Sequence, residues 1–147
     1  MTTAGGAVVA ALTFVWLGMV FAISFLEAPL KFRAPGVTLP IGLGGIGRLV
    51  FRALNAAEVV WAVAILIALV LGSWPGGVAV PTTAGVAIAA LGVQLVAVRP
   101  ALTKRSDAVL AGHEGPRSPA HLVYVAVEVI KVAALIWLGT AVLVSAT

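Results

Sequence analysis

The sequence predicts an all-α protein, a polytopic membrane protein built as a bundle of four transmembrane helices. Only 10% of its 147 residues are charged and 62% are hydrophobic, whereas a soluble domain carries about 25% charged residues. The mean hydropathy is +1.18. The apolar residues fall in four runs of about 20 residues or more, enough to cross roughly 30 Å of hydrocarbon. We therefore expect a single transmembrane domain, residues 1–147, with helices at about 4–26, 48–72, 78–98 and 120–144.

The first apolar run is expected to be a retained helix. No basic residue precedes it in "MTTAGGAVVA", and Glu27-Ala28-Pro29 follows it directly. A secretory signal peptide has a positive amino-terminal region and a cleavage site after small residues. Neither feature is clear in this sequence.

The connection between the first two helices is unusual. It spans Glu27–Gly47 and holds three prolines, yet most of its residues are apolar. Irregular backbone at membrane depth needs protein or a water-filled cavity to satisfy it. Two interpretations stay open. The segment is either a re-entrant piece that caps a cavity, or it lies among the lipid headgroups with Leu30, Phe32 and Leu39 in lipid.

The other two connections are simpler. "SWPGG" is a tight turn, so the second and third helices should form an antiparallel hairpin. The third connection, Arg99–Ala120, is polar and rich in proline and glycine. We expect a loop there with one helical turn around Thr103–Ala111.

The basic residues predict the orientation in the membrane. Eight of the nine lie in or beside the first and third connections, and "SWPGG" and both termini hold none. Positive charges favour the cytoplasmic side. The prediction is N-out and C-out with two cytoplasmic connections, set by Lys31, Arg33, Arg48, Arg52, Arg99, Lys104, Arg105 and Arg117. This placement explains the basic pI without nucleic acid as a partner.

The stretch "GLGGIG" matches the glycine fingerprint of dinucleotide-binding proteins at Gly42, Gly44 and Gly47. A dinucleotide site also needs a preceding strand and a parallel sheet, and a membrane helix follows these glycines instead. Two roles remain open. The glycines expose backbone N–H groups to an anion at a helix N-terminus, beside Arg48 and Arg52. Otherwise they allow close helix packing while the arginines meet lipid phosphates.

Ionisable residues recur inside the second and fourth helices at matching intervals. Arg48, Arg52, Asn55 and Glu58 are followed, in the fourth helix, by His121, Tyr124, Glu128 and Lys131. Equal offsets place equivalent members at equal depths, with the last of each about 15 Å below the first. An ionised group at that depth costs at least about 2.5–3.5 kcal/mol and should find a partner. We expect Glu58 to pair with Lys131, and Arg52 with Glu128.

These residues predict a polar cavity open to the cytoplasm. The alternative is an internal network of ion pairs that fixes helix register and binds nothing. The expected cavity residues are Glu27, Arg48, Arg52, Asn55, Glu58, His121, Tyr124, Glu128 and Lys131.

No catalytic residue, metal site or cofactor is predicted. The chain has no cysteine and two methionines, and its two histidines, His113 and His121, lie eight residues apart across two prolines. Copper favours Met or Cys ligands, and a haem held by two histidines needs them on facing helices. We expect His121 to be a hydrogen-bonding member of the polar cluster and His113 to be a solvated loop residue.

The runs "EAPLKFRAPG", "GLGGIGRLVFRALNAAE" and "HLVYVAVEVIKV" together resemble small four-helix bacterial membrane proteins that carry no assigned activity. The overall layout is similar to CopD-like four-helix proteins in architecture alone. The resemblance implies a multi-pass protein of the bacterial inner membrane. It implies no substrate.

Three functions stay open at this point. The first is a small transporter, channel or binding protein for an anionic or amphiphilic solute, working as a homo-oligomer such as a dimer in the lipid bilayer. The second is an accessory or assembly subunit whose charges only set helix register. The third is a membrane-embedded enzyme for a lipid or quinone, with His121 or Glu128 as the base and Tyr124 as a proton donor.

Overall fold

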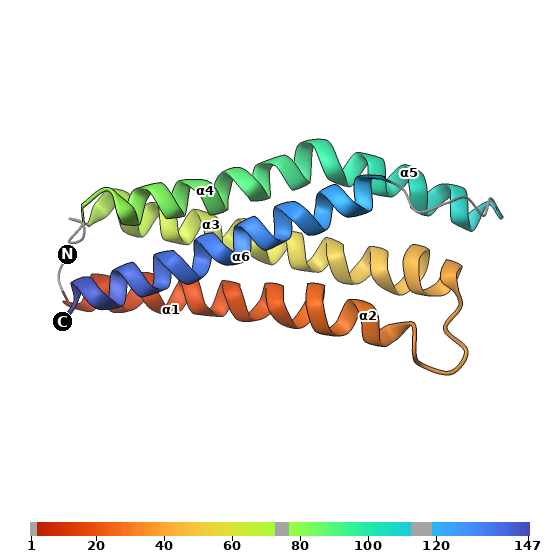
Figure 1. The fold of residues 1–147 in the computed structure, drawn as a ribbon, viewed down its shortest axis with the longest axis horizontal. Coiled ribbons are helices and arrows are strands. Elements are labelled where there is room, and N and C mark those ends of the chain that lie inside the picture. The colour runs from red at the N-terminus through yellow and green to blue at the C-terminus, as the bar shows by residue number, and fades with distance from the viewer. Residues whose placement is uncertain (1–2, 73–76, 113–118) are drawn as a thin grey trace.

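The computed structural model describes residues 3–72, 77–112 and 119–147, and within these ranges the chain is almost entirely helical. It forms four long helices, each of which runs antiparallel to the one before it (Figure 1). All four are long and apolar enough to cross a membrane, which indicates a multi-pass membrane protein. They are Ala4–Lys31, Pro40–Leu71, Ala79–Leu110 and Pro119–Ser145.

Three of the long helices change their hydrogen-bonding pattern along their length. Each contains a π-helical segment, in which the turns are wider than in an α-helix. The first long helix consists of α1 (Thr3–Val20), π-helical η1 (Phe21–Glu27) and α2 (Ala28–Lys31). The second consists of π-helical η2 (Pro40–Gly47) and α3 (Arg48–Leu71). The third consists of α4 (Ala79–Val93), π-helical η3 (Gln94–Val98) and α5 (Arg99–Leu110), and the fourth is α6 (Pro119–Ser145).

The helices form a four-sided bundle. α1 packs between α3 and α6, and α4 packs between α6 and α3. The two ends of the bundle differ in content (Figure 1). One end holds both chain termini. The other, which we call the pocket end, holds α2, the connection Phe32–Leu39 and α5. α6 runs obliquely across the bundle, from beside α5 at the pocket end to beside α1 at the other.

The helices extend further at the pocket end than the sequence pattern predicted. The first continues to Lys31, the second begins at Pro40 instead of residue 48, and the third continues to Leu110. The expected irregular segment Glu27–Gly47 is therefore reduced to Phe32–Leu39, and most of the expected loop after Arg99 is helix α5. The longest stretches have 32 residues, or about 48 Å at 1.5 Å per residue, against roughly 30 Å of hydrocarbon.

The predicted helix ends were wrong near three prolines, each of which lies where a helix begins or where its hydrogen-bonding pattern changes. Pro29 directly follows the start of α2 after η1, Pro100 holds the same position in α5 after η3, and Pro40 begins η2. Proline lacks a backbone N–H, and its ring clashes with the carbonyl one turn earlier in a regular α-helix. At Pro29 and Pro100 the wider π-helical turn before the proline gives the ring room, so the helix continues. Pro40 is the first residue of η2, where a proline meets no earlier turn.

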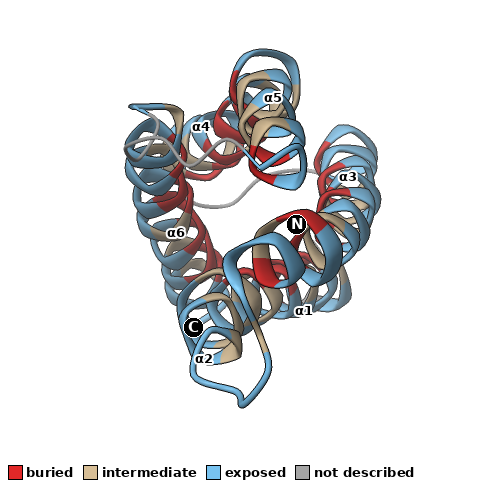
Figure 2. Ribbon diagram, turned by 90° about the vertical axis from the view of Figure 1, so that its right-hand side faces the viewer, coloured by how far each residue is buried: buried red, intermediate tan, exposed pale blue. Residues whose placement is uncertain are grey.

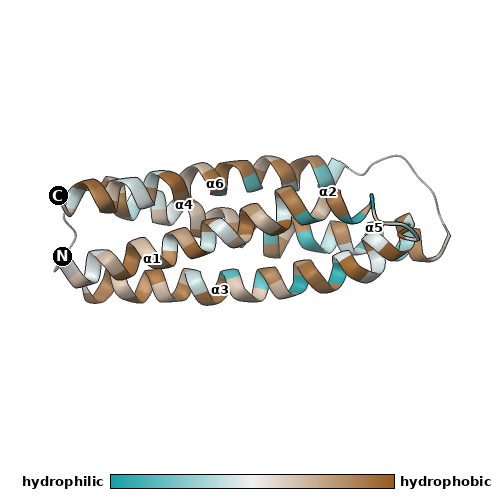
Figure 3. Ribbon diagram, turned by 90° about the horizontal axis from the view of Figure 1, so that it is seen from below, coloured by the Kyte–Doolittle hydropathy of each residue, from teal (hydrophilic) through white to brown (hydrophobic). Residues whose placement is uncertain are grey.

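The core and the outer surface are both apolar. The described core is a column of aliphatic side chains around Trp16, Ile65, Leu135 and Leu138, all of them at most 1% exposed. Figure 2 shows these buried positions lining the inside of all four long helices. Large apolar side chains also cover the outside, as expected for lipid contact. Hydrophilic residues gather toward the pocket end (Figure 3).

The glycines of "GLGGIG" serve close packing inside a helix. A Cβ at Gly44 would lie 2.6 Å from Cγ of Leu110 in α5, and one at Gly42 would collide with the ring of Phe32. Because the helix begins at Pro40, the N–H groups next to Arg48 are not those of a helix N-terminus. Of the two roles left open for these glycines, the structure therefore supports close packing and not an anion site at a helix N-terminus beside Arg48. In the connection, Gly36 has a φ of 81°, which glycine adopts most readily.

Candidate functional site

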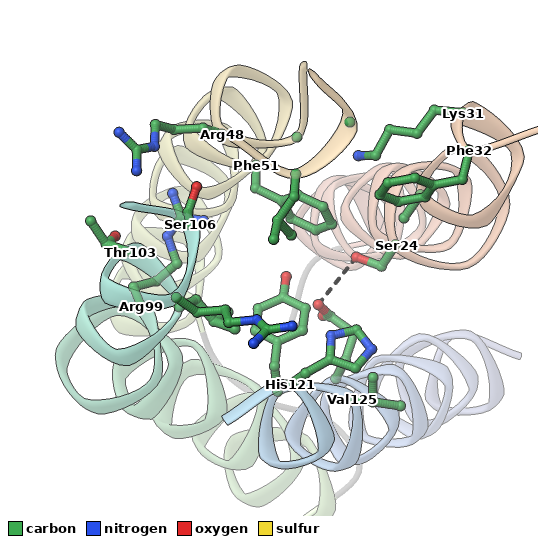
Figure 4. A pocket seen from close by; sticks show the side chains of 18 of the residues that line it. Ser24, Lys31, Phe32, Arg48, Phe51, Arg99, Thr103, Ser106, His121 and Val125 are labelled. Atoms are coloured by element: carbon green, nitrogen blue, oxygen red, sulfur yellow. Dashed lines mark hydrogen bonds between the residues drawn. The ribbon is translucent and has the colours of Figure 1, made fainter. Parts of the chain in front are cut away.

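A pocket opens between the helices at the pocket end. It encloses about 930 Å³ of space, which includes the part open to solvent at its mouth. η1, α2, η2, α3, α5 and α6 all contribute to it (Figure 4). Its wall is largely apolar, and its charged side chains are four basic residues against one carboxylate. These are Lys31, Arg48, Arg99 and Arg105 against Glu128, with the imidazole of His121 beside them.

Arg99 is the cation best placed to meet a ligand. It begins α5, is half-buried, and points into the pocket near His121 (Figure 4). Among the described residues, no carboxylate forms an ion pair with it. The hydroxyls of Ser106 and Tyr124 line the same pocket and are buried, with no hydrogen-bond partner in the part of the chain that the structure describes. A guanidinium and two free hydroxyls together can donate several hydrogen bonds to one anionic group.

The other pocket cations are held by neighbours. Nζ of Lys31 lies 3.5 Å from a carboxylate oxygen of Glu27, and it is 5.3 Å from the ring centre of Phe51, within cation–π range. Arg48 donates to Asp107 at 2.5 Å, which ties α3 to α5. Both pairs are partly exposed, so each contributes about 1 kcal/mol or less.

Below the pocket lies a buried polar cluster, which we define as Glu58, Gln94, Glu128 and Lys131. None of the four is more than 1% exposed. Lys131 donates to Glu58 and, at 2.7 Å, to the side-chain oxygen of Gln94. Its Nζ also lies 2.6 Å from a carboxylate oxygen of Glu128. The predicted pair of Glu58 with Lys131 is confirmed, since one lysine joins α3, η3 and α6 in the bundle interior.

The first long helix completes the cluster with two neutral donors. The indole N–H of Trp16 donates to Oε1 of Glu58 at 3.0 Å, and the hydroxyl of Ser24 donates to Oε2 of Glu128 at 3.1 Å. Ser24 and Glu128 also line the pocket. The cluster is therefore reached from the pocket through Glu128, while its far side is closed by the apolar core.

The nine predicted cavity residues fall into three groups. Four line the pocket, namely Arg48, His121, Tyr124 and Glu128. Glu58 and Lys131 lie in the cluster with Glu128, and Asn55 is buried one turn before Glu58, with its side-chain oxygen unpartnered. Glu27 lies at the edge, paired with Lys31. Arg52 is exposed.

The predicted pair of Arg52 with Glu128 is wrong, because Glu128 pairs with Lys131. The reason lies in the helical period. At 100° per residue, the six positions from Arg52 to Glu58 leave the two side chains about 120° apart around the helix. The burial of Glu58 therefore turns Arg52 outward.

Several functional side chains were missed from the sequence. Arg99 and Ser106 were assigned to a loop, although a continued helix would have placed both on α5 facing the bundle. Ser24 carried a signal, as a hydroxyl in an apolar stretch three residues before Glu27. Gln94, an amide inside the third apolar run, was not among the predicted site residues. His113 lies outside the described residues.

Comparison with protein families, with curated proteins and with solved structures gives no match for this chain. The geometry of the pocket and of the buried cluster is therefore the basis for assigning a function.

Proposed function

We propose that the protein binds an anionic amphiphile in the pocket, as a small membrane transporter or binding protein. The observation that carries the proposal is the guanidinium of Arg99, which forms no ion pair among the described residues and points into a pocket whose wall is largely apolar. An anionic headgroup would accept hydrogen bonds from Arg99, Ser106 and Tyr124. An attached hydrocarbon chain would contact the apolar walls.

The mouth of the pocket supports an amphiphile over a water-soluble anion. Phe25 on the first long helix and Val125 on α6 line the pocket, and they are 36% and 38% exposed. Accessible apolar side chains in the lining favour a ligand with a hydrocarbon chain, which would contact them while its headgroup is inside.

The position along the bundle fits the same ligand. The longest helices exceed the thickness of the hydrocarbon by up to about 18 Å. Hydrophilic residues gather toward the pocket end, which indicates that the helices leave the hydrocarbon there (Figure 3). The proposal places this end at the cytoplasmic face of a bacterial inner membrane, since the basic residues of the first and third connections gather there. Headgroups and pocket then lie at one level. The homodimer expected from the sequence stays part of the proposal.

Three probes separate the chemistry of the ligand. Native mass spectrometry of the protein in neutral detergent should show a saturable complex with dodecyl phosphate. Inorganic phosphate, which has no chain, and dodecyltrimethylammonium, which has no anion, should bind much more weakly. Equal binding of the cationic and anionic amphiphiles would refute the role of the basic pocket.

Arg99→Gln tests the residue that carries the proposal. Hydrogen bonds to charged groups contribute about 1.5–3 kcal/mol, so dodecyl phosphate affinity should fall by about 10- to 150-fold. Lys104→Gln is the matched control, because Lys104 is an exposed cation on the same helix. Unchanged affinity in Arg99→Gln, with the protein folded, would contradict the proposal.

The buried cluster favours a second candidate, an accessory subunit whose charges fix helix register. Polar contacts between membrane helices can serve that purpose alone. This candidate predicts that no probe binds saturably and that the protein is recovered in a larger membrane complex. A saturable dodecyl phosphate complex of the isolated protein would count against it.

A further inference from the structure

The buried cluster holds more negative than positive groups. Glu58 and Glu128 are two carboxyl groups, and Lys131 is the one ammonium that the structure pairs with both of them. These side chains are 0%, 1% and 0% exposed. If both carboxyls were ionised, the cluster would carry a charge of −1 where water does not reach it. An uncompensated buried charge is strongly disfavoured, and such a group usually becomes neutral instead.

The contacts distinguish the two carboxyl groups. Both oxygens of Glu128 have a polar neighbour: Oε1 lies 2.6 Å from Nζ of Lys131 in an ion pair, although it accepts no hydrogen bond among the described residues, and Oε2 accepts from the hydroxyl of Ser24 at 3.1 Å. Glu58 is engaged through Oε1 alone, which accepts from Lys131 and from Trp16. Oε2 of Glu58 is buried and has no hydrogen-bond partner among the described residues. This oxygen is the free proton-accepting atom of the cluster.

Among the residues that the structure describes, no second cation forms an ion pair with Glu58. Gln94 from η3 and Trp16 from α1 are neutral, as is Asn55, one turn away on α3. On α6, the hydroxyl of Tyr124 lies one turn before Glu128 and is also neutral.

The cations of the pocket lie on the other side of Glu128. Lys31 pairs with Glu27, and Arg48 with Asp107. Arg99 forms no ion pair with Glu128 in the structure. The charge of the cluster is therefore balanced within the cluster.

We propose that the cluster is a proton-binding site, with one proton taken from water held on Oε2 of Glu58. The neutral carboxyl keeps Oε1 as an acceptor for Trp16 and Lys131, and Lys131 and Glu128 form the remaining ion pair. The site needs no ligand in the pocket and goes beyond the proposed function. Because Glu128 belongs to both cluster and pocket, an anion bound beside it favours the protonated form, and the effect is reciprocal.

Infrared spectroscopy of the ligand-free protein at neutral pH tests the site directly. A protonated carboxylic acid has a carbonyl stretching band separate from the carboxylate bands. We expect this band in the wild type, its loss in Glu58→Gln, and its retention in Glu27→Gln, where the altered carboxyl lies at the pocket edge. No band in the wild type, or a band that persists in Glu58→Gln, overturns the proposal whether or not dodecyl phosphate binds.

Stability gives an independent second readout. Glutamine imitates a neutral carboxyl group, so Glu58→Gln should unfold at a denaturant concentration close to that of the wild type. Glu128→Gln removes the ionised partner of Lys131 and should unfold at a clearly lower concentration. Failure of Glu58→Gln to fold, or equal loss in both variants, would place the negative charge on Glu58 and overturn the assignment.

Discussion

Replacing Lys131 by methionine should destabilise the bundle more than any change on its surface. Methionine keeps most of the hydrocarbon stem, so the packing is retained and the ammonium is lost. Lys131 is fully buried and contacts Glu58, Glu128 and Gln94. Removing one partner of a buried ion pair costs about 3–5 kcal/mol, because the remaining charge is left uncompensated. We expect the upper part of this range, since Gln94 also loses its donor.

The double variant Lys131→Met/Glu128→Gln shows whether the cost comes from the charge. It removes both ionised partners, and replacing a buried pair by neutral groups is often close to neutral. At least half of the lost stability should therefore return. The assay is unfolding in mixed micelles, followed by helicity as the denaturing detergent is increased. Lys104→Met, at an exposed site, should change the free energy of unfolding by about 0.5 kcal/mol or less. If Lys131→Met were as mild as this control, the cluster would not stabilise the bundle.

Five further variants test three local features by the same unfolding assay. Gly45→Ala should stabilise the protein by about 0.5–1 kcal/mol, since nothing lies within 4 Å of the position of an added Cβ. Gly47→Ala should destabilise it by about 1–3 kcal/mol, because the added Cβ would lie 2.5 Å from a backbone oxygen. The opposite order of stability would contradict the packing described. Trp16→Phe should cost about 1–3 kcal/mol, since it leaves a buried carboxylate oxygen with one donor fewer; no loss would mean that this hydrogen bond is not formed. Arg48→Gln and Asp107→Asn should each cost less than about 1 kcal/mol, as their pair is 30% and 61% exposed, and a larger loss would show that the pair anchors α5.

The sequence predicted the helices well where composition decides and poorly where local geometry decides. Four apolar runs were enough to predict four long helices, and matched depths were enough to pair Glu58 with Lys131. The predicted helix ends were wrong near Pro29 and Pro100, where a π-helical turn lets the helix continue, and near Pro40, which begins a helix.

The site was predicted in part for the same reason. The spacing of residues along one helix gives their depth in the membrane. The face of the helix on which each residue lies follows only from the rotation of 100° per residue, and neglect of this rotation led to the wrong partner for Arg52. Arg99 was missed because its role depends on α5 continuing the third long helix. The pocket itself forms where segments from all four long helices meet, an arrangement that no local sequence pattern encodes.

The buried cluster also sets an order of events during biosynthesis. Glu58 and Lys131 are 73 residues apart, so at roughly 5–20 residues per second the carboxyl group exists for about 4–15 s before its lysine is made. Until then, α3 carries an acidic group whose insertion into the hydrocarbon of the membrane is unfavourable. The fourth helix is therefore the closing element of the bundle. A chain truncated before α6 would expose Glu58 without its cation, and it is the form that a quality-control protease in the membrane would be expected to remove.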